Sequence, residues 1–172
     1  FAGKGMAITP IGGNSKRGIP SVYFTDGPRG VIVGKDKTGF PVPMARAATW
    51  NVALEQKIGM AIADEAREEG AGLIGTPCMN LLRHPANGRA QEGFGEDPYL
   101  VGQMALHLMQ GIQSRGVMAT AKHFALNSLE NSRYTINVKI DERTLQEVYL
   151  PHFKLCIDNG VASVMSAYNK VN

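Results

Sequence analysis

Apolar residues along the chain form two kinds of stretch: short continuous runs, and longer segments in which they recur every three or four positions. The continuous runs predict strands that are buried on both faces, and the spaced segments predict amphipathic helices. The expected strands are residues 21–25, 73–80, 117–123 and 161–167, and the expected helices include the apolar positions within 54–66, 100–112 and 145–157. This alternation predicts a parallel α/β sheet within one domain.

Residues typical of helix ends stand at the limits of these segments. Asp97 is a capping residue followed by Pro98 at the first helical position, and Asp141 precedes the third helix. Glycines end the three helices, at Gly70 with Gly72, at Gly116 and at Gly160. The side chains expected to face the core from the first and third helices are Leu54, Ile58, Ala61, Ile62, Ala66, Leu145, Val148, Leu150, Phe153 and Ile157.

Polar residues interrupt the apolar pattern where strands are expected to end. Asp26 follows the first run, Lys122-His123 closes the third, and Tyr168-Asn169 follows the last. In (β/α)8 barrels, residues at the carboxyl ends of the strands build the active site. A complete barrel takes about 250 residues, whereas this chain has 172. The pattern therefore predicts an α/β fold, a partial (β/α)8 TIM-like barrel that is incomplete at its C-terminal side.

Composition narrows the function classes. The chain is 44% hydrophobic and 19% charged, which is enough apolar material for a sizeable core. Its net charge of +3 is small and the charges are interspersed, so nucleic acid and membrane surfaces are not expected partners. The basic pair Lys16-Arg17 lies in a glycine-rich segment followed by Ile19-Pro20 and a strand-like run, which indicates a solvated turn rather than a phosphate loop before a helix.

Two cysteines, Cys78 and Cys156, lie far apart in apolar surroundings and form no CxxC unit. We interpret both as buried thiols, and no metal or redox cofactor is expected from them.

Several polar residues near the expected strand ends have chemistry suited to sugar hydroxyls. Asp26 can accept hydrogen bonds from two adjacent hydroxyls or simply form a turn. Arg89 offers a fork for vicinal hydroxyls, and a surface arginine is an equally good interpretation. Lys122 is a cation at a buried strand end and needs a partner. His123 can reach the same ligand only if the strand bends, because consecutive strand residues point to opposite faces. Tyr168 combines an aromatic ring with a hydroxyl.

The sequence resembles family 3 glycoside hydrolases of the β-glucosidase type. The matching segments occur in family order over nearly the whole chain: Asp26-Gly27-Pro28, Ala47-Ala48-Thr49-Trp50-Asn51, Gly88-Arg89 with Glu92, Gly95-Glu96-Asp97-Pro98-Tyr99-Leu100, Lys122-His123-Phe124 with Asn127, and Ser166-Ala167-Tyr168-Asn169. The resemblance implies that residues 1–172 are part of the N-terminal (β/α) barrel domain and that a second α/β domain is absent from the chain. It implies substrate binding by Asp26, Arg89, Lys122, His123, Arg133, Met165 and Tyr168.

The activity implied by the resemblance is hydrolysis of terminal, non-reducing β-D-glucosyl residues by a retaining mechanism, with no metal and no cofactor. The nucleophilic aspartate and the acid/base are expected beyond Asn172, so the isolated fragment should be inactive without the missing C-terminal part of the same protein. A β-xylosidase or another exo-glycosidase of the family remains an alternative, as does a catalytically silent sugar-binding fragment. A barrel enzyme for phosphorylated substrates lacks the glycine-rich loop before a helix.

Two departures from the family pattern bear on specificity. Ile32 stands where many members have an arginine, which removes one expected hydroxyl contact. Ala125-Leu126-Asn127 replaces the Pro-Gly-His of the N-acetylglucosaminidase branch, which favours the glucosidase branch.

Overall fold

The computed structural model of the chain describes residues 8–34 and 36–172, and its centre is a five-stranded sheet in the order β1-β2-β3-β4-β6. The strands are β1 (Thr9–Ile11), β2 (Val22–Asp26), β3 (Leu73–Gly75), β4 (Met118–Phe124) and β6 (Ser163–Ser166). From β2 to β6 all neighbours pair in parallel. The antiparallel pairing of β1 with β2 was not expected from the sequence.

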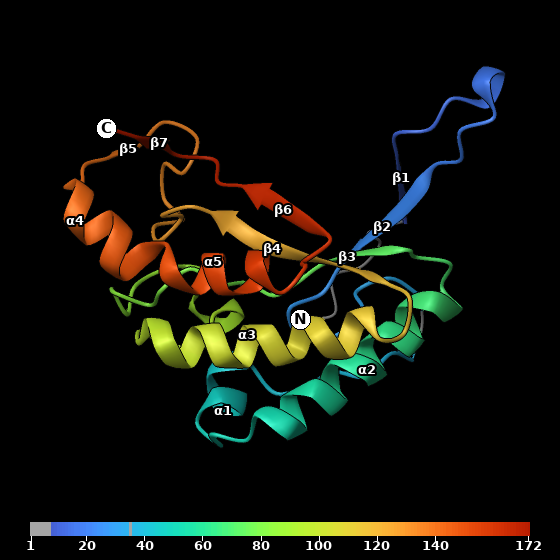
Figure 1. The fold of residues 1–172 in the computed structure, drawn as a ribbon, viewed down its shortest axis with the longest axis horizontal. Helices are drawn as coiled ribbons and strands as arrows, with labels where there is room; N and C mark the ends of the chain where they lie inside the picture. The colour runs from blue at the N-terminus through green and yellow to red at the C-terminus, as the bar shows by residue number, and fades with distance from the viewer. Residues whose placement is uncertain (1–7, 35) are drawn as a thin grey trace.

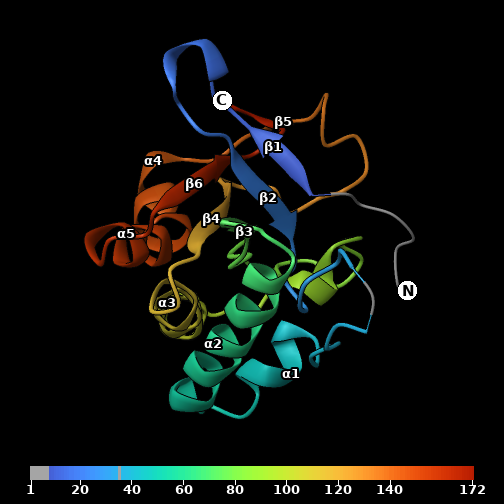
Figure 2. The same ribbon diagram turned by 90° about the vertical axis from the view of Figure 1, so that its right-hand side faces the viewer.

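The helices cover one face of this curved sheet (Figure 1). They are α1 (Pro43–Ala47), α2 (Val52–Glu68), α3 (Pro98–Gln113) and α5 (Pro151–Asp158). Figure 2 shows α2 and α3 packed side by side beneath the strands. Parallel strands linked by helices on the outer face form part of a (β/α) barrel wall, which confirms the predicted fold class.

Two glycines let α2 and α3 approach closely. A Cβ added to Gly111 would overlap the backbone oxygen of Gln56, and one added to Gly59 would overlap the backbone oxygen of Leu108. Of the side chains expected to face the core from α2, Ile62 and Ala66 are buried and Ile58 packs against the core, whereas Leu54 is 42% exposed and Ala61 is exposed.

A buried ion pair between Arg46 and Glu55 joins α1 to α2. Glu55 on α2 and Arg46 on α1 are 1% and 3% exposed, and Arg46 Nη2 lies 3.0 Å from Glu55 Oε1. Arg46 also donates to the backbone oxygens of Pro28 (3.2 Å) and Pro41 (3.3 Å). The pair therefore anchors the segment that follows Asp26.

The predicted helix starts are confirmed, whereas the third helix is not continuous. Asp97 Oδ1 accepts from the Leu100 amide at 2.7 Å, and Asp141 Oδ1 from the Thr144 amide at 2.9 Å. The segment after Asp141 divides into α4 (Glu142–Thr144), a π-helical turn η3 (Leu145–Tyr149) and α5. The break falls before Pro151, which has no amide hydrogen to donate to the preceding turn.

The expected inward face of the third helical segment is confirmed in part. Phe153 is buried and Val148 packs against the core, as expected, whereas Ile157 is 49% exposed and Cys156 is buried. The change in helical winding across η3 shifts the face that reaches the core.

Two expected strands are shorter than predicted. The strand expected at 73–80 ends at Gly75, because Pro77 cannot donate to a ladder. The chain nevertheless continues beside β4, where the Lys122 amide donates to the oxygen of Pro77 at 3.0 Å. β6 spans only four residues at the sheet edge, and Val164 is 43% exposed rather than buried.

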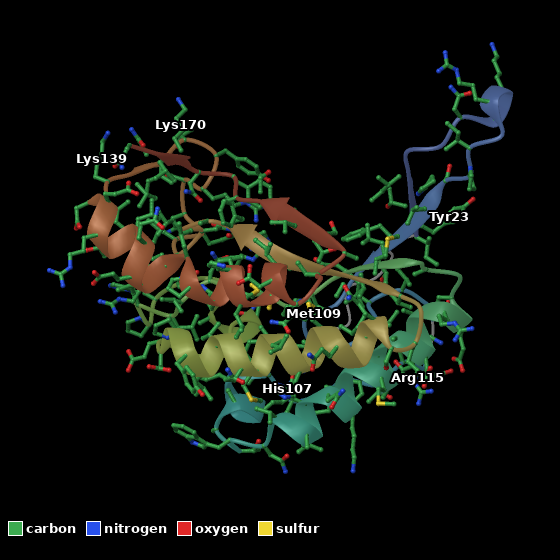
Figure 3. The ribbon with its side chains drawn as sticks, in the orientation of Figure 1. Tyr23, His107, Met109, Arg115, Lys139 and Lys170 are labelled. Carbon is green, nitrogen blue, oxygen red and sulfur yellow. The ribbon has the colours of Figure 1, made fainter. Side chains whose placement is uncertain are left out.

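The hairpin of β1 and β2 projects from the body, with the 3₁₀ turn η1 (Ser15–Arg17) at its tip (Figure 1). Lys16 and Arg17 are exposed there, which confirms the prediction of a solvated turn. A small parallel sheet of β5 (Asn137–Val138) and β7 (Lys170–Val171) places the C-terminal residues beside the loop that follows β4. Figure 3 shows Lys139 and Lys170 at this sheet, on the side of the molecule opposite His107 of α3.

Both cysteines are free and buried, as expected. Among residues 8–34 and 36–172, no helix combines the length and apolarity needed to cross a membrane.

Candidate active site

Asp26 and Lys122 meet at the carboxyl ends of β2 and β4. Lys122 Nζ lies 2.5 Å from Asp26 Oδ1, and the lysine side chain is 1% exposed against 29% for the aspartate. The Gly27 amide also donates to Asp26 Oδ1, at 3.0 Å. The carboxylate supplies the partner that a buried strand-end cation requires, and both side chains lie at the strand ends where a barrel site is expected.

A second carboxylate, that of Glu92, extends this pair to Arg89. Glu92 ends the 3₁₀ turn η2 (Ala90–Glu92), and its two oxygens accept from Nε and Nη2 of Arg89, each at 2.8 Å. Glu92 Oε2 also lies 3.9 Å from Lys122 Nζ. Burial opposes the charge of Arg89, but the hydrogen bonds to Glu92 raise the pKa of the guanidinium above its usual value.

No binding or anchoring role was predicted for Glu92 from the sequence. The sequence did contain one indication of its contact with Arg89: the two residues are three positions apart, and side chains at this spacing meet when the segment between them is helical. Four charges of alternating sign thus run from Asp26 through Lys122 and Glu92 to Arg89.

His123 reaches the same site through an irregularity in β4. Lys122 pairs with Met165 and Phe124 with Ser166, so His123 is an additional residue on its strand. Such bulges redirect side chains, and both Lys122 and His123 are 1% exposed. β4 therefore bends at this point, as it must if the neighbouring side chains of Lys122 and His123 are both to reach one ligand.

Asn80 holds the His123 ring in a defined orientation. Its Oδ1 accepts from the His123 amide at 3.0 Å and lies 3.1 Å from His123 Nδ1, while its Nδ2 donates to the His123 oxygen at 2.9 Å. Because Asn80 Oδ1 is an acceptor, Nδ1 carries the proton and Nε2 is the lone-pair nitrogen of the neutral ring. Burial, then the cations Arg89, Lys122 and Arg133, lower the pKa of His123 to about 3, so the ring is neutral near pH 7.

Aromatic contacts connect His123 to the end of β6. The rings of His123 and Tyr168 lie 5.9 Å apart, and the Arg133 guanidinium lies 4.3 Å from the centre of the Tyr168 ring. Arg133 also lies 4.8 Å from the centre of the Tyr134 ring, and its Nη1 donates to Glu130 Oε1 at 2.7 Å. Tyr134 and Glu130 were not among the predicted site residues.

Contacts therefore join the site residues that were predicted from the sequence, with the exception of Met165. Arg89 and His123 line one small cavity together with Asn127, whose amide oxygen and nitrogen are buried without hydrogen-bond partners in the described chain. Met165 is brought beside Lys122 by strand pairing but makes no polar contact with the other predicted residues among those the structure describes.

A hollow of about 580 Å³ adjoins this cluster. Its lining includes Asp26, Glu92 and Ile32. Within the described ranges, no three histidine, cysteine or acidic side chains are grouped to hold a metal ion. The arrangement offers charged donors and acceptors at spacings suited to a polyhydroxylated ligand.

The family model of the "Glycosyl hydrolase family 3 N terminal domain" matches residues 9–172. The chain belongs to glycosyl hydrolase family 3. Among family relatives, it is 42% identical to beta-glucosidase B of Emericella nidulans over 163 residues, and that match covers 91% of this chain and 19% of the relative. It is 40% identical to beta-glucosidase BoGH3A of Bacteroides ovatus, in a match that covers 92% of this chain and 23% of the relative.

Solved family structures share this fold. The beta-glucosidase 3B of Thermotoga neapolitana in complex with glucose matches with a TM-score of 0.92 and 37% identity, over 96% of this chain and 25% of that one. The beta-glucosidase of Kluyveromyces marxianus in complex with glucose matches with a TM-score of 0.91 and 35% identity, over 96% of this chain and 21% of that one. This chain of family 3 thus spans about a fifth to a quarter of the length of the relatives it matches.

Proposed function

We propose that this chain is the sugar-binding part of a retaining β-glucosidase that removes terminal, non-reducing β-D-glucosyl residues. The observation that carries the proposal is the alternating cluster of Asp26, Lys122, Glu92 and Arg89 at the carboxyl ends of β2 and β4. Asp26 Oδ2 and Arg89 Nη1 have no hydrogen-bond partner in the described part of the chain, so an acceptor and a donor remain for ligand hydroxyls.

Each predicted site residue has a role in this proposal. Asp26 accepts from the hydroxyls at the far side of the sugar ring, and Arg89, Lys122 and His123 hold the middle ones. Tyr168 stands near the nucleophile, with Arg133 against its ring. Met165 lines the site beside Lys122.

The chemical step needs two carboxyl groups about 5–5.5 Å apart, one as nucleophile and one as acid/base. In the described chain, both Glu92 oxygens and Oδ1 of Asp26 are engaged by cations. We therefore assign the catalytic carboxylates to a part of the protein beyond these residues, and a second α/β domain to the same longer protein. The small share of each relative that the chain matches supports this assignment.

A second specificity within the same reaction class stays open. One relative, 35% identical over 93% of this chain, is an exo-alpha-(1->6)-L-arabinopyranosidase of Bifidobacterium longum. Both structural relatives described above were solved with glucose, which favours a glucoside. A β-xylosidase is a further alternative, because a xylosyl ring differs only by the absence of the hydroxymethyl group.

The test uses the full-length protein that contains these residues. We expect hydrolysis of 4-nitrophenyl β-D-glucopyranoside with a higher kcat/KM than of the β-D-xylopyranoside or α-L-arabinopyranoside, and proton NMR should detect β-glucose as the first product. First release of α-glucose would refute retention, and preference for another glycoside would reassign the substrate. Residues 1–172 alone should not turn over any of the three.

A further inference from the structure

The carboxylate of Glu92 contacts both cations of the proposed site. Its oxygens accept from Nε and Nη2 of Arg89, each at 2.8 Å, and Oε2 lies 3.9 Å from Nζ of Lys122. The side chains of Arg89 and Glu92 are only 15% and 17% exposed. Solvent therefore screens these contacts weakly, and they are stronger than equivalent contacts at the surface.

The position of Glu92 decides which edge of the Arg89 guanidinium faces a ligand. Glu92 occupies the edge formed by Nε and Nη2, and Nη1 is buried without a hydrogen-bond partner among the described residues. Arg89 lines the small cavity that also includes His123. Bidentate binding fixes the plane of the guanidinium, whereas a single contact would leave it free to rotate.

Glu92 also affects Asp26 through their common neighbour. Lys122 lies 2.5 Å from Asp26 Oδ1 and 3.9 Å from Glu92 Oε2, so its charge is shared between two carboxylates. Together with Arg89 the four groups carry two negative and two positive charges. Removal of the Glu92 charge would leave two cations facing one carboxylate and would draw Asp26 away from a ligand hydroxyl.

We infer that Glu92 is a positioning residue of the glycosidase site, which orients Arg89 and balances Lys122 without touching the sugar. This inference rests on the proposed function, because it assumes that Arg89 and Lys122 bind the substrate.

The experiment compares Glu92→Gln with Glu96→Gln in the full-length protein. Glu96 is exposed, lies in the same segment and makes no ion pair in the ranges that the structure describes. For an aryl β-D-glucoside, Glu92→Gln should lower kcat/KM by roughly 100-fold, the scale expected when binding groups are displaced by about 1 Å. Glu96→Gln should stay within about twofold of the wild type.

A double-mutant cycle separates positioning from an independent role. In an Arg89→Ala background, Glu92→Gln should lower kcat/KM much less than in the wild type, because most of its effect passes through Arg89. An equal loss in both backgrounds would overturn the inference, as would a Glu92→Gln variant that behaves like Glu96→Gln.

Folding and function are separated by two further readouts. Melting temperature is measured for every variant, and the affinity of the folded protein for D-glucose is measured by calorimetry. If Glu92→Gln yields little folded protein, Glu92→Asp takes its place in the same cycle, since it keeps the charge but cannot span the same distance. If the wild-type protein cleaves no glycoside, both the proposed function and the inference about Glu92 are refuted. If the wild type is active but Glu92→Gln does not change its kcat/KM, only the inference about Glu92 is refuted.

Discussion

Replacement of Glu55 by glutamine removes one charge of the buried ion pair between α1 and α2. Glu55 and Arg46 are 1% and 3% exposed and lie 3.0 Å apart. Burial raises the pKa of Glu55, and the neighbouring guanidinium opposes that rise. Breaking such a pair costs about 3–5 kcal/mol, because the remaining charge stays buried without compensation.

The structure places the expected loss at the lower end of that range. Arg46 keeps two carbonyl acceptors, the oxygens of Pro28 and Pro41, after the substitution. We therefore expect Glu55→Gln to lower the free energy of unfolding by about 3 kcal/mol. The double variant Arg46→Met/Glu55→Met should lose only about 1–2 kcal/mol, since no buried charge remains and two hydrogen bonds to carbonyls are lost.

Urea denaturation of the 172-residue chain, followed by far-UV circular dichroism, measures these differences. The matched control is Glu147→Gln, which removes one charge of the exposed pair with Arg143, whose side chain is 82% exposed. That change should cost no more than about 0.5 kcal/mol. If Glu55→Gln costs as little as the control, or if the double variant is less stable than Glu55→Gln alone, the reasoning about the buried charge is wrong.

Three further predictions concern packing, pH and the site. Gly111→Ala should lower the unfolding free energy by about 1–3 kcal/mol in urea, because its Cβ would overlap the Gln56 oxygen; unchanged stability would contradict the packing. Burial lowers the pKa of His152 to about 4, so the folded state binds fewer protons than the unfolded state and stability should fall as pH drops from about 6.5 to 4. His152→Gln should flatten the urea-measured slope by up to about 1.4 kcal/mol per pH unit, whereas exposed His84→Gln should not. In the full-length protein, Lys122→Met should lower kcat/KM of the folded enzyme for an aryl β-glucoside more than about 100-fold; lost stability with normal specific activity of the folded fraction would indicate a structural lysine.

The local sequence was sufficient for the order of β2, β3, β4 and β6 and of the long helices, whereas β1, α1, β5 and β7 were not predicted. Capping by Asp97 and Asp141 depends on residues three positions away, so it can be read from the chain itself. Asp26 and Lys122 can each be picked out as a polar residue at the end of an apolar run. Parallel pairing of the strands then brings these ends to one edge of the sheet.

Contacts between distant segments decided the rest. The inward face of α2 depends on its approach to α3, and β6 lies at a sheet edge, so periodicity alone misplaced Leu54 and Val164. The bulge at His123 and its bonds to Asn80 join residues 43 positions apart, and the Lys122–Asp26 pair spans 96. Sequence patterns reveal which residues are unusual where they stand, but a charge acquires its partner only when the chain has folded, and partner and burial together determine what a side chain can bind.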